Sequence, residues 1–242
     1  VKSATPDGYT LMVGSSGPMT LNPVIVKDLP YHPVKDFRAV ILFGLGPVMF
    51  VTHATSPHRT IVEHIAALKK TGNSMQIGFY SPAYEIVCLW LGASAGISTA
   101  MIPYKGLTAV ATELVGRQIS LGVMDSGALP LIKDGRLRAI GISTRERHAL
   151  VPDTPTLIES GVPNFRYYGW NGVVAPRGVP QPVIHTLNQR MKDQLATPEI
   201  RQAYLAQGEE PAYSTVEEFR KLIADDFVQM GRMVKLAGIK PE

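Results

Sequence analysis

Apolar runs of strand length alternate with helical segments through the middle of this chain. Met75–Phe79 and Ser98–Ile102 are predicted strands that flank a helix over Tyr84–Leu91. Ser81 is a good N-cap for this helix, with Pro82 at the first helical position. After a turn and a helix to about Val115, Ile119–Met124 is the next strand. Because strand–helix–strand repeats build parallel sheets, this alternation predicts the α/β class with a largely parallel sheet. The 242 residues, 45% apolar and 18% charged, can bury a full core as one large domain or two smaller ones.

Further elements are predicted on both sides of this segment. The strands are Tyr9–Val13, Leu137–Ser143, the aromatic run Tyr167–Ala175, and Ala39–Leu45 with Val48–His53, which read as two strands or as one strand crossing between domains. The helices are Ile61–Lys70, a short capped helix within Pro152–Gly161, a long helix opened by Pro180 and Pro182, Pro198–Gln207 and Val216–Leu236, with Gly208 between the last two. No run is apolar for long enough to span a membrane.

The turn at Pro103–Gly106 joins a predicted strand to a predicted helix. Pro103 fixes its own φ, and Gly106 permits backbone angles that a Cβ would resist. A helix that starts after such a turn leaves its first N–H groups free, where they can hold an anion. The turn is therefore either an ordinary β–α connection or one wall of a site for a small carboxylate.

Three other small or polar loops also follow predicted strands: Gly14–Pro18, Tyr80–Ala83 and Asp125–Gly127. Ligands of open α/β sheets bind beyond the carboxyl ends of strands, so four such loops favour a binding site. Asp125 could accept hydrogen bonds from an amine, amide or hydroxyl of a ligand, or it could simply cap a turn.

Few residues have the spacing that catalysis or a cofactor requires. Gly92–Gly96 matches Gly-x-Ser-x-Gly, but a nucleophile elbow needs a strand before Ser94 and a helix after it, and here the order is reversed. The six histidines have no helical metal-pair spacing and are expected at the surface, so neither a metal nor a cofactor is predicted. The net charge of +4 comes from scattered residues, so nucleic-acid binding is not expected.

Several phrases, taken together and in order, resemble the Bug family, the TctC-like extracytoplasmic solute receptors of tripartite tricarboxylate transporters. The phrases are Pro-Asp-Gly-Tyr-Thr-Leu at 6–11, Asp-Phe-Arg-Ala-Val at 36–40, Pro-Tyr-Lys-Gly at 103–106, Gly-Arg-Leu-Arg-Ala-Ile at 135–140, Pro-Asp-Thr-Pro-Thr at 152–156 with Glu159 and Gly161, and Gly-Trp-Asn-Gly at 169–172 with Ala175-Pro176. Each phrase alone is weak, but their order and spacing cover nearly the whole chain.

The resemblance implies a two-domain periplasmic-binding-protein fold, type II-like, that closes on a ligand in the interdomain cleft and performs no catalysis. Residues 1–46 with 175–242 would form one domain and 52–167 the other, with hinge crossings at 47–51 and 168–174. Backbone N–H groups at the strand–helix loops would hold the carboxylate. The candidate ligand-binding residues are Ser15, Ser16, Tyr80, Ser81, Pro82, Ala83, Tyr104, Lys105, Gly106 and Asp125.

Two departures from the family pattern bear on the ligand. Family members carry a strand–helix–strand unit with a Gly-rich ligand loop before the Asp-Gly-Tyr-Thr phrase, and this chain starts after it. Phe79 and Tyr80 also stand where the family usually has a Gly-x-Gly-Ser-like turn, which favours a flat or aromatic ligand. Dicarboxylates, amino acids, aromatic acids and their amides all stay open.

The resulting hypothesis is a monomeric periplasmic receptor that delivers a small carboxylate to the permease subunits of a membrane transporter. One rival is the effector-binding domain of a transcription regulator, which has a similar fold and would follow a helix-turn-helix in the full gene. The other rival is a serine esterase that uses Ser94.

Overall fold

The structure is a computed structural model that describes residues 1–206, 211–236 and 238–239. The backbone contacts divide the chain into two compact units: unit 1 is Val1–Gly46 with Gly169–Glu242, and unit 2 is Pro47–Tyr168. The chain passes between the units twice, once at the end of the strand Phe37–Pro47 and once at the start of the strand Tyr168–Pro176. Gly208, predicted to separate two helices, lies outside the described residues.

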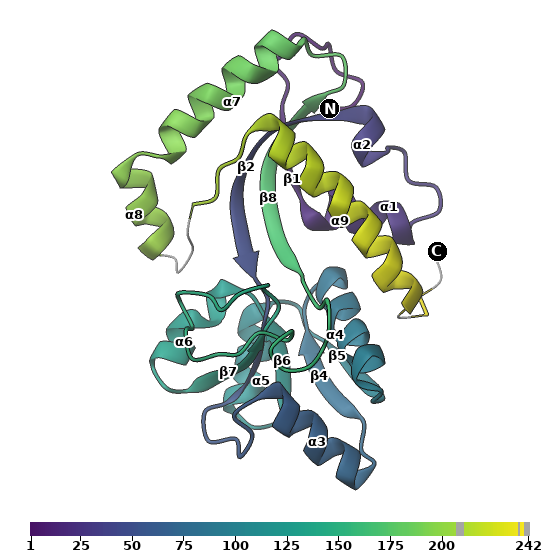
Figure 1. Ribbon diagram of the computed structural model, residues 1–242, viewed down its shortest axis with the longest axis vertical. Coiled ribbons are helices and arrows are strands. Elements are labelled where there is room, and N and C mark those ends of the chain that lie inside the picture. Colours follow the sequence, from purple (N-terminus) through teal and green to yellow (C-terminus); the bar gives the residue numbers. More distant parts are fainter. Residues whose placement is uncertain (207–210, 237, 240–242) are drawn as a thin grey trace. The chain divides into compact units, whose positions relative to one another are not determined.

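Unit 1 is built around a sheet with the strand order β1-β8-β2 (Figure 1). Its elements are β1 (Met12–Ser15), the π-helical turn η1 (Gly17–Leu21), α1 (Asn22–Ile25), α2 (Pro33–Asp36), β2 (Phe37–Pro47), β8 (Tyr168–Pro176), α7 (Gln181–Leu195), α8 (Pro198–Ala206) and α9 (Val216–Leu236). β1 runs antiparallel to β8, with Met12 opposite Val174 and Ser15 opposite Asn171.

The core of unit 1 is centred on Trp170 of β8. Its ring meets the ring of Phe219 edge-on, with centroids 5.2 Å apart, and its indole N–H donates to the buried carboxylate of Asp226 at 2.7 Å. Both partners come from α9, whose apolar face has helical spacing. This packing holds the last long helix against the sheet.

Unit 2 contains a sheet with the order β5-β4-β6-β3-β7 among the described residues. Its elements are β3 (Met49–His53), α3 (Ile61–Thr71), β4 (Met75–Phe79), α4 (Pro82–Ala95), β5 (Thr99–Pro103), α5 (Leu107–Val115), β6 (Leu121–Met124), the 3₁₀ turn η2 (Ser126–Ala128), α6 (Leu129–Lys133) and β7 (Leu137–Ile142). A Cβ on Gly122 of β6 would lie 2.7 Å from Val110 and 2.9 Å from Leu114, so α5 packs directly on this sheet.

The prediction of a largely parallel sheet is wrong, because this sheet is mixed. β4 runs parallel to β5 and β6, but β3 runs antiparallel to both β6 and β7. The cause is the way the chain enters: β3 follows β2 with no crossover helix, and it starts at the edge where β6 ends, with Met49 opposite Met124. From there it can only run back along β6.

Two predicted boundaries near ligand-facing loops are also wrong. The strand predicted at Tyr9–Val13 begins only at Met12, and Tyr9 is 93% exposed. The predicted loop Gly14–Pro18 does not form, because Gly14 and Ser15 belong to β1 and a helical turn starts at Gly17. Pro18, near the start of that turn, has the φ that a helix needs.

α4 runs past its predicted end. Gly92 lies inside the helix, where a Cβ would collide with Thr99 of β5, so the missing side chain permits close packing. The helix ends instead at Gly96, whose φ of 61° is left-handed. Its start was predicted correctly: Ser81 is the N-cap and accepts from the amide of Tyr84, and Pro82 is the first helical residue.

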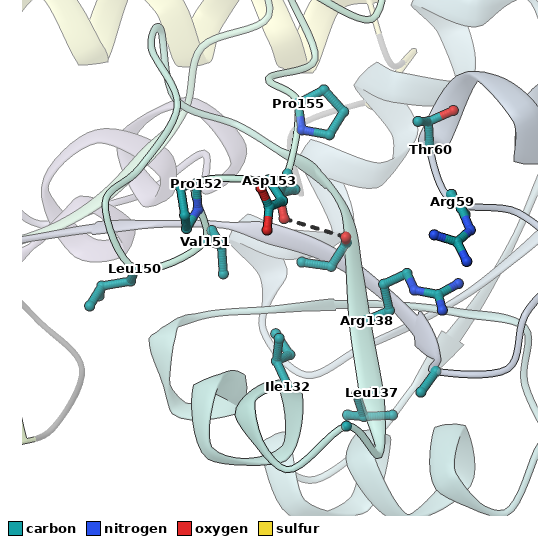
Figure 2. Close-up of a pocket in the computed structure, with 14 residues that line it drawn as sticks. Arg59, Thr60, Ile132, Leu137, Arg138, Leu150, Val151, Pro152, Asp153 and Pro155 are labelled. Atoms are coloured by element: carbon teal, nitrogen blue, oxygen red, sulfur yellow. Dashed lines mark hydrogen bonds between the residues drawn. The ribbon is translucent and has the colours of Figure 1, made fainter.

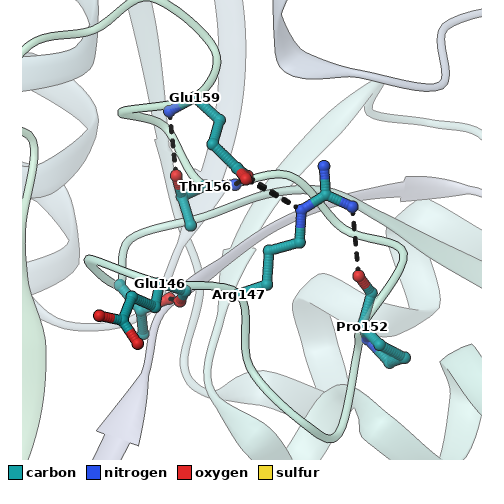
Figure 3. Close-up of polar contacts among 6 residues, drawn as sticks. Glu146, Arg147, Pro152, Thr156 and Glu159 are labelled. Carbon is teal, nitrogen blue, oxygen red and sulfur yellow. Dashed lines mark hydrogen bonds and ion pairs between the residues drawn. The ribbon is translucent and has the colours of Figure 1, made fainter.

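The helix predicted within Pro152–Gly161 is absent, although its capping interactions form. Figure 3 shows Thr156 and Glu159 bonded to each other: the amide of Glu159 donates to Thr156 Oγ1, and the amide of Thr156 donates to Glu159 Oε2. Arg147 holds the same carboxylate. The backbone at Pro155 and Leu157 bonds to Ile142 of β7 instead of continuing as a helix.

Among the residues that the structure describes, no helix is both long enough and apolar enough to cross a membrane.

Candidate functional site

Three of the predicted loops lie at one edge of the sheet of unit 2. β5, β4 and β6 are parallel neighbours, with Phe79 opposite Pro103 and Gly78 opposite both Ile102 and Gly122. Their carboxyl ends therefore meet at the same edge, and the loops Tyr80–Ala83, Pro103–Gly106 and Asp125–Gly127 follow them there. This is where ligands bind in sheets of this kind.

Tyr104 is tied into the fold rather than presented to the edge. Its amide donates to the carbonyl of Phe79 at 2.8 Å, which extends the β4–β5 pairing by one residue. Its ring lies over Gly78, where a Cβ would come within 3.1 Å of the ring carbon Cε2. The amide of Tyr104 is therefore occupied, and its side chain covers the sheet.

The next four amides, those of Lys105, Gly106, Leu107 and Thr108, donate to no acceptor among the described residues. Leu107 and Thr108 begin α5, where no preceding helical carbonyl exists, and Lys105 and Gly106 come directly before it. The partial positive charge of the helix start adds to their ability to hold an anion. Lys105 is exposed, and its ammonium makes no ion pair with the described residues.

Gly106 does not adopt the special backbone conformation expected of it. Its φ of 171° and ψ of 174° are extended, which any residue can adopt, and a Cβ there would meet no atom within 4 Å. The open space above Gly106 matters more than its backbone freedom, because it leaves the neighbouring amides uncovered.

The start of α4 provides less backbone than expected. Pro82 has no N–H, and the amide of Tyr84 is occupied by Ser81, so Ser81 and Ala83 are the only members of the loop Ser81–Ala83 that carry an amide. Ala83 is buried, whereas Ser81 is partly exposed. This loop therefore offers fewer donors than the turn before α5.

Asp125 is the centre of a hydrogen-bonded group at the same edge. Its Oδ2 accepts from the hydroxyls of Tyr80 at 2.7 Å and Tyr84 at 3.2 Å, while its Oδ1 accepts from the amide of Gly127 at 2.9 Å. The two tyrosine rings meet edge-on, 5.0 Å between centroids. A carboxylate has about four acceptor positions, so one stays available for a ligand.

Burial, and then the negative charge of Asp125, raise the pKa of both the Tyr80 and the Tyr84 hydroxyl well above the usual value. Both phenols consequently keep their protons and act as donors to the carboxylate. The group is a fixed wall in which Asp125 positions two aromatic rings.

Comparison with known proteins identifies the family of this chain. The model of the TctC family, described as the tripartite tricarboxylate transporter family receptor, matches residues 1–239. The chain belongs to this receptor family. Members of the TctC family bind solutes and are not enzymes.

Individual members of the family are similar over almost the entire chain. Protein BugT of Bordetella pertussis is 30% identical, covering 99% of this chain and 74% of its own. The solved structure of a periplasmic transporter is 30% identical with a TM-score of 0.83 and covers 99% of this chain and 81% of that one. MatC from Rhodopseudomonas palustris with bound malate is 26% identical with a TM-score of 0.77, covering 97% and 82% respectively.

The other two candidate residues belong to unit 1. Ser15 ends β1, opposite Asn171 of β8, and is partly exposed. Ser16 is buried, and its carbonyl accepts from the hydroxyl of Thr20 at 2.6 Å. Only Ser16 follows the strand, and both serines lie in a different unit from the other eight candidates.

The structure also shows where Ser94 and the histidines lie. Ser94 is exposed on the last turn of α4, not at a strand–helix elbow, as expected for a family without catalysis. Within the described ranges, no group of three or more His, Cys, Asp or Glu side chains could hold a metal. The expectation of surface histidines is wrong for His64, which is 3% exposed, because α3 turns it inward.

Sequence reasoning missed Tyr84 as a partner of Asp125. The spacing of Tyr80 and Tyr84 was no guide, because Tyr80 precedes the extended N-cap Ser81 and lies outside α4, so the helical i,i+4 rule does not apply to this pair. What the sequence did not contain was the distance to Asp125, which depends on β4 and β6 being neighbours.

Proposed function

We propose that this chain is a periplasmic solute receptor that binds a small carboxylate and delivers it to the membrane permease of a tripartite tricarboxylate-type transporter. Membership of the TctC family supports the receptor role, and MatC, which holds malate, supports a carboxylate as the ligand. The single observation in this chain that carries the proposal is the row of four amides without an acceptor at residues 105–108.

In the proposed mechanism, these amides hold one carboxylate group of the ligand. Charge-assisted hydrogen bonds from backbone donors, together with the start of α5, supply the binding energy without a buried cation. Tyr80 forms a flat wall, and the free acceptor position of Asp125 orients a hydroxyl, amine or amide on the rest of the ligand. Ser15 and Ser16 would complete the site from unit 1.

Closure would use the two places where the chain passes between the units, 46–47 and 168–169, which fall at the starts of our proposed hinge segments 47–51 and 168–174. Binding in the closed form would shift the population from open to closed receptor. The closed form would then be the one that the permease recognises.

A proline substitution can remove one of these amides. Leu107 is the first residue of α5, a position where proline is tolerated, and the residue before it is extended, as a residue before proline prefers. Leu107→Pro deletes the N–H, whereas the control Leu107→Ala shortens the side chain and keeps the N–H. A hydrogen bond to a charged group contributes about 1.5–3 kcal/mol, so Leu107→Pro should weaken carboxylate binding about tenfold or more relative to Leu107→Ala.

The affinities would be measured by calorimetry, after a thermal-shift screen of dicarboxylates, amino acids and aromatic acids. A ligand present at about a hundred times its Kd should add about 2.7 kcal/mol of stability, which such a screen detects easily. Equal carboxylate affinity in Leu107→Pro and Leu107→Ala would contradict the proposed role of the amides.

A further inference from the structure

Unit 2 contains a pocket that is separate from the loops described above. It is a hollow of about 650 Å³ whose polar lining includes Arg59, Arg138 and Asp153, with Leu150 and Pro152 among its apolar lining (Figure 2). Asp125 follows β6, and Met49 of β3 lies opposite Met124 at that edge. The pocket instead adjoins the other end of β3, where His53 pairs with Leu137. It therefore lies at the opposite edge of the sheet.

Two arginine side chains reach the same side of this pocket in Figure 2. Arg59 precedes α3, and its guanidinium has no hydrogen bond or ion pair with the residues described. Arg138 comes from β7 and donates through Nη1 to the carbonyl of Ser56 at 3.2 Å. Two guanidinium groups carry up to ten N–H donors, and only one of these is occupied here.

The fold holds both residues in place. The amide of Arg59 donates to Glu63 Oε2 at 2.6 Å, and the amide of Glu63 donates to Oγ1 of Thr60, the N-cap of α3. Arg138 lies within a sheet, opposite Thr52 of β3. The backbone positions of the two cations are therefore set before any ligand arrives.

The charges of the pocket are not neutralised by its own carboxylate. Asp153 lines the pocket with the arginines but forms no ion pair with either of them among the described residues. In Figure 2 it lies away from the two guanidinium groups. A bound anion would therefore meet two cations on one side and a hydrogen-bond acceptor on the other.

We propose that this pocket binds a phosphate group, either free or as a small phosphomonoester. Phosphate carries about −1.5 to −2 charge near neutral pH and presents three or more oxygens, so it can engage both guanidinium groups at once. A carboxylate has one charge and two oxygens, which a single arginine fork satisfies. Asp153 would accept from the acidic O–H of hydrogen phosphate or from a hydroxyl of the ester.

The apolar part of the lining extends the same inference. Leu150 and Pro152 offer a surface against which the carbon portion of a phosphomonoester can pack. Inorganic phosphate would leave this surface uncovered. Glycerol phosphate should therefore bind at least as tightly as inorganic phosphate. Tighter binding of glycerol phosphate indicates a phosphomonoester as the ligand, whereas equal affinity indicates free phosphate.

The test is a calorimetric titration of the full chain with inorganic phosphate and with glycerol phosphate, at constant ionic strength. The decisive variant is Arg59→Gln, because that side chain makes no hydrogen bond or ion pair with the described residues; Arg138→Gln is the second. Each should lower phosphate affinity about tenfold or more. Arg145→Gln, which removes the same charge from an exposed loop of the same unit, should leave it unchanged.

Saturable phosphate binding that is lost in both pocket variants and kept in Arg145→Gln supports the site. Absence of saturable binding at millimolar phosphate, or equal affinity in wild type and Arg59→Gln, overturns it. Leu107→Pro distinguishes this proposal from the receptor function, because it alters the other edge of the sheet and should bind phosphate as the wild type does. Loss of phosphate binding in Leu107→Pro would place the phosphate in the receptor site and overturn a separate pocket.

Discussion

The buried histidine of α3 should make unit 2 sensitive to acid. His64 is 3% exposed, its Nδ1 lies 3.2 Å from Nδ1 of His58, and its Nε2 is buried without a hydrogen-bond partner in the described structure. Burial first, and then the neighbouring His58, lower the pKa of His64 from 6.5 to about 4. The folded unit therefore favours the neutral ring.

The sign of the effect follows from which state takes up the proton. Above pH 6.5 the ring is neutral in both states, and the full stability is present. As the pH falls from 6.5 to about 4, His64 of the unfolded chain binds a proton while His64 of the folded unit stays neutral. The free energy of unfolding therefore decreases across this window. The pKa difference corresponds to at most about 3 kcal/mol.

The assay is urea unfolding at a series of pH values between 7.5 and 4, followed by tryptophan fluorescence, to which Trp90, buried in unit 2, contributes. His64→Leu removes the titrating group and should lose less stability over this range than the wild type, by up to about 3 kcal/mol. The control His53→Gln removes a histidine that is not buried and should keep the wild-type acid dependence. An identical loss in wild type and His64→Leu would refute the reasoning.

Two further predictions concern packing and the discarded esterase. In the sheet of unit 1, a Cβ on Gly172 would come 2.8 Å from the carbonyl oxygen of Ile41 and collide with Phe219, so Gly172→Ala should lower the free energy of unfolding by about 1–3 kcal/mol. Gly44→Ala, whose Cβ would make only ordinary contacts at 3.6 Å, is the matched control, and an equal loss from both in urea unfolding would contradict the packing argument. Ser94→Ala should leave carboxylate affinity unchanged in calorimetry, and any ester hydrolysis that this variant abolished would restore the rival function.

Much of unit 2 could be predicted because its signals are local. Met75–Phe79 was predicted exactly, and the Ser81-Pro82 start of α4 was recognised from capping rules. The three loops of unit 2 could be assigned to one edge because carboxyl ends of parallel strands meet. Each of these inferences needs only neighbouring residues and one general rule.

The errors come from contacts between distant parts of the chain. The direction of β3 depends on where it enters unit 2, and the backbone near Thr156 pairs with β7 instead of forming a helix. Likewise, the amide of Tyr104 is occupied by Phe79, a residue 25 positions earlier on the neighbouring strand. No local pattern contains this information.

The three loops of unit 2 lie at one sheet edge as predicted, but their hydrogen bonds were not predicted. The turn before α5 presents free amides as argued from its residues, yet they begin at Lys105 rather than at Tyr104. Asp125 was singled out as a possible ligand contact, whereas three of its acceptor positions are filled by Tyr80, Tyr84 and Gly127. These hydrogen bonds depend on the three-dimensional positions of the side chains, which the sequence does not contain.

The most direct test of the receptor function is a calorimetric comparison of malate with its dimethyl ester, which has the same carbon skeleton without the charges. If main-chain amides hold a carboxylate, the acid or a related dicarboxylate found in the screen should bind saturably, and its ester should bind at least about tenfold more weakly. Equal binding of acid and ester, or no saturable binding of any carboxylate by the full-length protein, would contradict the account.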